Sequence, residues 1–415
     1  MNVRRNEVLV TGDDYGAQWN LAVWDPSNGT SLVTYKGGTS IPGSFNILGS
    51  SYVVSVLKNK AVLNVWRLDR HEQLPQKITT PGKLKALSAN PNDGRFLVGS
   101  IAESIYLWQT NTGRLLNILV RHYQEVNRLA WTDDGSFILS AGKDGALIAW
   151  SLSEVMSPSE STKEPYHIWN DSALEITDLV VGKGGPRARI FTCSYDQHVR
   201  VYDLPSASLL LEVTFSKPLT SIAVDSSEVW IYLGSSKGDI HTFSLRDTPC
   251  KSDSIKTMIS PSQKNSFLGH SLPISCLSIS IDGSTLASGS EDKDVRIWDV
   301  KSRQTLRIIS MKGLVTIATF LSPPPRGMLD HEDFLQDLNL CQLEKNIGSN
   351  DNYTLKVSTP YGFEDSFLED DTLSPIPYAA KSESSNINNN DKEVERLKKI
   401  NMSLYQSAVE LILNK

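Results

Sequence analysis

The sequence predicts an all-β protein built from seven copies of one small antiparallel sheet, followed by a C-terminal extension. An aromatic residue closes a β-rich run seven times, at Trp24, Trp66, Trp108, Trp150, Tyr202, Phe243 and Trp298. Four of the six intervals are 41 or 42 residues, and the other two contain roughly 10 and 13 additional residues. A chain of 415 residues exceeds one ordinary domain, but a repeat array accommodates that length.

The unit from 126 to 150 shows the order of strands within one repeat. A first strand ends at Thr132, a second runs over about 137–141, and a third carries Trp150. Asp-Gly and Gly-Lys-Asp-Gly turns separate them, and such turns between apolar runs indicate hairpins. A fourth strand follows the aromatic residue. The same pattern recurs at 84–108 with 113–120, and at 274–298 with 303–310.

The two ends of the repeat array complement each other. Residues 7–14 correspond to a second strand and its turn, so the first unit lacks its innermost strand. Residues 314–323, which follow the seventh unit, have the pattern of that missing strand. Pairing the two would close a ring with no open sheet edge. The sequence therefore predicts a seven-bladed β-propeller over residues 1–323.

Four strands in 40–45 residues that end on Trp-Asp are typical of WD-repeat proteins, and residues 5–322 resemble that family, most faithfully at 269–299. The resemblance implies buried tetrads of His, Ser or Thr, Asp and Trp, which hold a blade together. The matching residues are His122, Ser140, Asp144 and Trp150, and His270, Ser288, Asp292 and Trp298. We expect both histidines to be structural, and neither catalytic nor metal-binding. The other blades lack the full set.

Two insertions and a long extension lie outside the repeats. Residues 153–166 and 246–266 are polar Ser/Pro-rich loops, expected to be variable surface or, alternatively, partner contacts or phosphorylated loops. Residues 327–390 contain twelve acidic residues and three lysines. We expect 324–390 to be an acidic, partly disordered linker. Its scattered apolar residues could form a short helix or a strap on the propeller; they are Phe334, Leu335, Leu338, Leu340 and Leu343.

The last segment, 391–415, has the pattern of an amphipathic coiled-coil-like helix. Its two seam positions are occupied by Val394, Asn401 and Ala408, and by Leu397, Leu404 and Leu411. Three heptads are marginal alone, so this helix requires a partner. It packs on its own propeller, or it pairs with a second copy or another subunit.

Motifs for chemistry are absent or misplaced. Gly234 and Gly238 belong to a G-x-S-x-G match, but that match falls in a hairpin turn instead of a strand–turn–helix. The four cysteines include no CxxC pair, and no apolar run is long enough for a membrane span. We predict no enzyme activity, no cofactor, no metal and no membrane contact. A net charge of −6 favours docking through proteins over direct contact with RNA.

A narrower resemblance rests on residues 21–38, 102–126 and 137–152, above all on Arg-His-Tyr-Gln at 121–124. These segments resemble the WD-repeat subunit of the Rix/PELP ribosome-assembly complex, called WD-repeat protein eighteen in animals and Ipi-three in yeast. The resemblance implies a non-catalytic scaffold in the nucleus, both nucleolus and nucleoplasm. It would act in maturation of the large (60S) ribosomal subunit, including removal of the second internal transcribed spacer from pre-rRNA.

The partners implied by this resemblance are a Rix/PELP-type helical-repeat scaffold and other pre-60S assembly factors. Self-association is also implied, and the C-terminal helix is the candidate contact. The alternative is a substrate-receptor or chromatin-complex adaptor, which also lacks catalysis. A propeller enzyme would require converging carboxylates or metal ligands at the channel mouth, and the sequence offers none.

Overall fold

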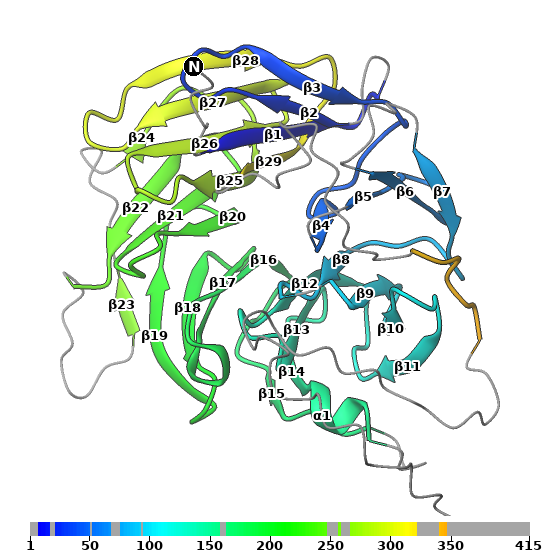
Figure 1. The fold of residues 1–415 in the computed structure, drawn as a ribbon. Helices are drawn as coiled ribbons and strands as arrows, with labels where there is room; N and C mark the ends of the chain where they lie inside the picture. Colours follow the sequence, from blue (N-terminus) through cyan, green and yellow to red (C-terminus); the bar gives the residue numbers. More distant parts are fainter. Residues whose placement is uncertain are drawn as a thin grey trace, which may run out of the picture. The chain divides into compact units, whose positions relative to one another are not determined.

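The computed structural model describes residues 7–16, 21–49, 52–67, 75–92, 94–157, 163–246, 256–258, 266–321 and 340–346. Within these residues the chain forms seven sheets, antiparallel except for one added edge strand, and Figure 1 shows them arranged in a ring. The prediction of an all-β seven-bladed propeller is therefore confirmed. In each blade the innermost strand faces the ring axis, and the following strands lie successively further out.

The first four blades contain four strands each, named in order from the ring axis outward. Blade 1 contains β29 (Val315–Leu321), β1 (Val8–Asp13), β2 (Leu21–Trp24) and β3 (Ser31–Tyr35). Blade 2 contains β4 (Asn46–Leu48), β5 (Tyr52–Val56), β6 (Val62–Arg67) and β7 (Gln76–Thr79). Blade 3 contains β8 (Leu87–Ala89), β9 (Phe96–Ile101), β10 (Ser104–Gln109) and β11 (Leu115–Val120). Blade 4 contains β12 (Val126–Trp131), β13 (Phe137–Gly142), β14 (Leu147–Ser151) and β15 (His167–Trp169).

The last three blades follow the same order, with one added strand. Blade 5 contains β16 (Ile176–Val181), β17 (Arg189–Ser194), β18 (His198–Asp203), β19 (Ser208–Thr214) and β23 (Lys256–Met258). Blade 6 contains β20 (Leu219–Val224), β21 (Trp230–Ser235), β22 (Ile240–Ser244) and β24 (Ser266–Phe267). Blade 7 contains β25 (Ile274–Ile279), β26 (Thr285–Ser290), β27 (Asp294–Asp299) and β28 (Thr305–Ser310).

The ring closes by pairing the end of the repeat array with its start, as the sequence predicts. Strand β29 runs antiparallel to β1, with Val8 opposite Leu321 and Gly12 opposite Ile317. Blade 1 is thereby completed by a strand from the far end of the repeat array, and the inner edge of its sheet is paired.

The hydrophobic core lies between blades. Each of seven apolar clusters joins residues of two neighbouring blades, and each contains or borders one of the predicted aromatic residues. Trp66, for example, packs with Val8, Val10 and Tyr35 of blade 1. The repeat therefore places one large side chain at every blade interface, where it buries most of its surface.

A belt of polar side chains on the innermost strands also joins the blades. The second residue of one inner strand donates a hydrogen bond to the first carbonyl of the next blade's inner strand. The donors are Asn127, Thr177, Thr220 and Ser275, and the acceptors are Ile176, Leu219, Ile274 and Val315. Each such bond contributes roughly 1 kcal/mol, so the belt favours a fixed ring over independently moving blades.

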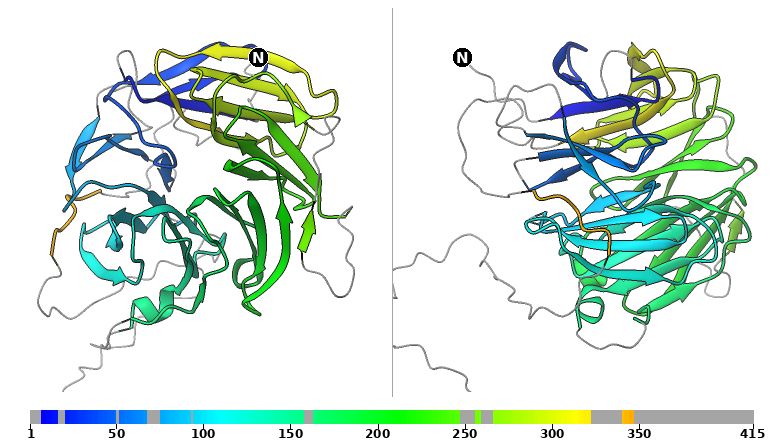
Figure 2. Two further views of the ribbon diagram at one scale, coloured as in Figure 1. Left: turned by 180° about the vertical axis from the view of Figure 1, so that it is seen from behind. Right: turned by 90° about the vertical axis from the view of Figure 1, so that its right-hand side faces the viewer.

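The two faces of the ring carry different connections, and the edge-on view in Figure 2 separates them. We call one of them the tetrad face. It is formed by the loops that lead from one blade to the next and by the turns between second and third strands. The opposite face carries the connections between first and second strands and between third and fourth strands, which include both insertions.

The insertions hold more regular structure than their composition predicts. Residues 152–155 form α1 (Leu152–Val155), with Val155 buried. Strand β23, within the second insertion, pairs in parallel with β19 of blade 5. The expectation of two plain polar loops is thus corrected. The reason is that the outermost strand of a blade leaves backbone groups unpaired, and a passing segment can satisfy them. A short 3₁₀ turn, η1 (Gly185–Arg187), lies in blade 5.

Candidate protein-interaction site

The structure brings the four tetrad residues of blade 4 together. The Nδ1 atom of His122 lies 3.0 Å from Oδ2 of Asp144, and its Nε2 lies 2.8 Å from Oγ of Ser140. The indole Nε1 of Trp150 donates to the same Ser140 oxygen at 3.2 Å. The backbone N–H of Tyr123 donates to Asp144, so the tetrad also fixes the loop between blades 3 and 4.

Blade 7 repeats this geometry. His270 lies 2.8 Å from Asp292 and 2.7 Å from Ser288, and Trp298 donates to Ser288 at 2.8 Å. Burial lowers the pKa of His270 more than the neighbouring Asp292 raises it. A neutral imidazole can donate from Nδ1 to Asp292 and accept from the Ser288 hydroxyl at Nε2, and this arrangement satisfies every member of the chain.

The tetrad aspartates remain ionised. Burial opposes the charge on Asp144, but hydrogen bonds from His122 and from the Tyr123 and Ala146 amides outweigh it and lower the pKa of Asp144. The pKa of Asp292 is lowered for the same reasons, with His270 and Asp294 as donors. Both carboxylates are thus occupied by hydrogen bonds within their own blades, and this leaves little capacity for general acid–base chemistry.

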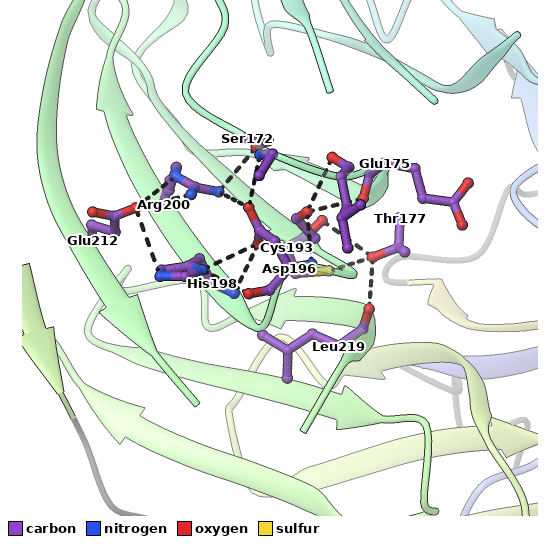
Figure 3. A network of polar contacts seen from close by, with 12 residues as sticks. Ser172, Glu175, Thr177, Cys193, Asp196, His198, Arg200, Glu212 and Leu219 are labelled. Carbon is purple, nitrogen blue, oxygen red and sulfur yellow. Dashed lines mark hydrogen bonds and ion pairs between the residues drawn. The ribbon is translucent and has the colours of Figure 1, made fainter. Parts of the chain in front are cut away.

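Blade 5 replaces the histidine with a different network, drawn in Figure 3. Arg200 is buried and donates to Asp196 at 2.9 Å, to Ser172 at 3.0 Å and to Glu212 at 3.0 Å. Asp196 also accepts the backbone N–H of Ala173 at 3.2 Å, just as Asp144 accepts that of Tyr123. Ser172 therefore stands where blade 4 has its histidine. The sequence does not reveal this exchange, because Arg200 lies on the third strand, outside the tetrad positions.

Blade 3 obtains a substitute partner from beyond the ring. Gly99 occupies the tetrad serine position, and a Cβ there would lie 3.0 Å from the Trp108 ring. The Trp108 indole instead donates to the carbonyl of Glu344 at 3.0 Å. Residues 340–346, which we call the strap, lie along blades 2 and 3; this is the orange segment in Figure 1.

Several contacts hold the strap in place. Leu343 is 4 % exposed and belongs to the core cluster of blades 2 and 3, which Leu340 also contacts. The Glu344 backbone N–H donates to Gly113 at 2.8 Å. The Gln342 side chain pairs with the backbone of β7, accepting from Thr79 and donating to Lys77. The strap thus provides hydrogen-bond partners for the free edge of blade 2.

The tetrad face carries most of the exposed apolar side chains that lie in described loops. Its loops contain Tyr15, Tyr123, Leu174, Tyr195, Leu268, Leu272 and Leu314, whereas described loops of the opposite face contain Tyr166 and Ile281. Leu174 and Tyr195 of the first group line one hollow of about 470 Å³ between blades 4 and 5, and Tyr123 directly precedes Gln124, which also lines it. Tyr123 is 91 %, Leu174 54 % and Tyr195 40 % exposed. We call these three, with Gln124 and Glu175, the blade-4/5 surface.

This surface has the composition of a protein contact. Exposed tyrosines on loops held by rigid tetrads provide large contact area at low entropic cost. The Lys143 ammonium beside the hollow is paired with Glu125 at 2.7 Å, while Glu175 lies at its rim. The sequence does not single out Leu174 or Tyr195, because exposure of an apolar residue depends on which loop of the ring carries it.

Comparison with known proteins agrees with this geometry. The family model described as WD domain, G-beta repeat matches residues 113–151 and 261–299, the two units that contain the tetrads. WD repeat-containing protein 18 of Mus musculus is 42 % identical over 82 % of this chain and 78 % of its own length. The Danio rerio protein of that name is 36 % identical over 98 % of both chains.

The chain belongs to the WD repeat-containing protein 18 family. Pre-rRNA-processing protein IPI3 of Yarrowia lipolytica is 29 % identical over 69 % of each chain. The family resemblance inferred from residues 21–38, 102–126 and 137–152 is therefore confirmed. Because the match to Danio rerio extends over 98 % of both chains, family membership includes the segments beyond the propeller.

The remaining sequence-predicted sites fall into two groups. The G-x-S-x-G match lies in the hairpin of β21 and β22, as expected: its first two residues end β21 and the other three form the turn. The six residues of the predicted oligomerisation helix, Val394, Leu397, Asn401, Leu404, Ala408 and Leu411, lie outside the described residues, as does Cys250. Cys193, Cys276 and Cys341 are free thiols; the first is buried, the second partly buried and the third exposed.

A metal site or a membrane span would require particular groups of side chains. Among the described residues, no three His, Cys, Asp or Glu side chains come together as metal ligands. Within the same part of the chain, no helix has the length and hydropathy of a membrane span.

Proposed function

We propose that this chain is a non-catalytic scaffold in the nuclear maturation of the large (60S) ribosomal subunit, including processing of the internal transcribed spacer of pre-rRNA. The observation that carries the proposal is its relationship to two groups at once. It aligns with WD repeat-containing protein 18 over nearly its whole length, and it aligns with IPI3, a protein named for pre-rRNA processing.

The geometry supports a scaffold. The polar groups of the ring that resemble catalytic residues are engaged in tetrads, in the blade-5 network or in the inter-blade belt. A ring with rigid blades and many loops can hold several partners in fixed relative positions. We propose a Rix/PELP-type helical-repeat protein as the main partner, with other pre-60S factors, and the blade-4/5 surface as one of the contacts.

Purification of the tagged chain from nuclear extract tests this proposal. We expect recovery of a Rix/PELP-type scaffold together with large-subunit precursors. A variant with Tyr123→Ala, Leu174→Ala and Tyr195→Ala should recover at least tenfold less of that scaffold protein than the unaltered chain does. The matched control, Leu306→Ala with Ile308→Ala on the exposed outer strand β28, should retain it. Recovery of a cullin adaptor or chromatin subunits without precursors would instead favour the adaptor function.

The C-terminal helix is tested in the same experiment. We propose that residues 391–415 mediate self-association. A chain ending at Asn390 should therefore fail to recover a second, differently tagged copy. If it recovers that copy as well as the full chain does, self-association must be assigned elsewhere.

A further inference from the structure

The charged side chains of the tetrad face are unevenly distributed around the ring. Five lysines lie in the loops at this end of blades 2 and 3, where Glu103 is the one acidic residue among the described loop residues. We call Lys36, Lys58, Lys60, Lys83 and Lys85 the lysine patch. The corresponding loops of blade 5 carry Asp171, Glu175 and Asp196 instead. The near-neutral charge of the whole ring hides this separation.

Backbone hydrogen bonds hold the loops of the patch side by side. The N–H of Lys58 donates to Thr39 at 3.2 Å, which joins the turn of blade 2 to the loop that carries Lys36. The N–H of Thr80 donates to Ala61 at 3.0 Å, which joins the same turn to the loop of Lys83 and Lys85. The loops that carry the five lysines are therefore joined to one another across two blades.

Most of the positive charge on this surface is uncompensated. Lys58 pairs with Asp14 at 3.2 Å and Lys85 with Glu125 at 3.4 Å, at the two ends of the patch. Lys36, Lys60 and Lys83 are exposed, and no acidic group of the described residues pairs with them. A surplus of solvated ammonium groups attracts a polyanion, mainly through counterion release.

An exposed aromatic side chain beside the patch distinguishes the kind of polyanion. Tyr15 is 62 % exposed and directly follows Asp14, the partner of Lys58. Aromatic side chains next to a basic surface are the usual platform for unpaired bases, which every single-stranded RNA offers and an acidic peptide does not. The blade-2 end of the tetrad face therefore combines both features of a single-strand site.

We infer that the lysine patch, with Tyr15 at its edge, binds the phosphate backbone of single-stranded RNA. This inference deepens the proposed function, because pre-rRNA would be the ligand. The net charge of the chain favours docking through proteins, and the inference adds a direct RNA contact on one part of the tetrad face. Blades 2 and 3 contact RNA, whereas the blade-4/5 surface contacts protein.

Fluorescence anisotropy measures binding of the purified full-length chain to a fluorescein-labelled oligouridylate. An RNA of about 20 nucleotides is longer than a single binding site for single-stranded nucleic acid. Contact with about four phosphates gives a slope of log K against log salt near −3. Affinity should then fall roughly 50-fold when salt rises from about 50 mM to 200 mM. Replacing Lys36, Lys60 and Lys83 by Gln should reduce the magnitude of the slope by about 2.

The matched control is Lys183→Gln with Lys237→Gln and Lys301→Gln, which removes equal charge from other parts of the ring. It should leave the slope within about 0.5 of the unaltered chain. Equal effects of the two triple variants would overturn the inference, as would tighter binding of a poly-glutamate peptide than of the RNA. Because purified components are used, failure here leaves the purification result of the proposed function intact.

Discussion

The strap offers the sharpest test of how this fold is held together. The change is Leu343→Ala. Leu343 is 4 % exposed in the shared core of blades 2 and 3, although it belongs to a segment well beyond the last blade strand. Buried Leu→Ala changes cost roughly 2–5 kcal/mol, and the rim position of the strap places this one near the lower end, at about 2–3 kcal/mol.

Two kinds of contact contribute to that magnitude. The lost methyl groups remove apolar burial. A loosened strap also weakens two hydrogen bonds of Glu344, the one that its carbonyl accepts from the Trp108 indole and the one that its N–H donates to Gly113. For a domain of this size, about 2–3 kcal/mol corresponds to a fall in Tm of roughly 5 °C. Calorimetry measures the shift, and hydrogen exchange reports protection of residues 340–346 and of the Trp108 indole.

The control for this prediction is Leu306→Ala, since Leu306 is 55 % exposed on β28. It should change the unfolding free energy by less than about 0.5 kcal/mol. If Leu343→Ala leaves both Tm and exchange protection unchanged, the strap does not contribute to the stability of the ring, and the assignment of Glu344 as the Trp108 partner is wrong.

Three further predictions concern the ring itself. Ser288→Ala removes the hydrogen-bond partner of both His270 and Trp298, so the free energy of unfolding measured in urea should fall by about 1–3 kcal/mol. A fall below about 0.5 kcal/mol would refute the structural role given to the tetrad. Burial lowers the pKa of His270 below its ordinary 6.5, so the contribution of neutral His270 to stability should be fully present above that pH and decline as the pH falls further. His270→Asn should therefore make Tm less dependent on pH between about pH 7 and 5. Burial raises the pKa of the Cys193 thiol, and it raises the pKa of the partly buried Cys276 thiol to about 11. Iodoacetamide should therefore modify exposed Cys341 before either of them, and equal rates in the native chain would contradict this difference in accessibility.

The architecture of the ring was accessible from the sequence because each blade repeats one pattern. Seven recurring aromatic residues, with four of their six intervals at 41 or 42 residues, specify seven interfaces. Residues 7–14 and 314–323 identify the shared blade. Both tetrads could be named by matching His, Ser, Asp and Trp to the pattern of the WD-repeat family that the chain resembles. Local turn signals and strict spacing are enough for such features, since they recur within one chain.

What the sequence did not reveal depends on contacts between distant segments. Nothing near Trp108 indicates that its indole bonds Glu344, because the two residues are joined only through the folded ring. In the sequence, Arg200 has no feature that sets it apart from other strand residues. Only the folded blade 5 brings it beside Asp196 and Glu212. The blade-4/5 surface and the lysine patch arise the same way, from loops that the ring sets next to one another.

The most direct test of the central claim is depletion and rescue in cells of the source organism, read out on pre-rRNA. Depletion should cause accumulation of large-subunit precursors that retain the second internal transcribed spacer, with small-subunit rRNA unaffected. The unaltered chain should reverse this, and the variant with Tyr123→Ala, Leu174→Ala and Tyr195→Ala should not. Normal precursor levels after depletion would contradict a role in large-subunit maturation.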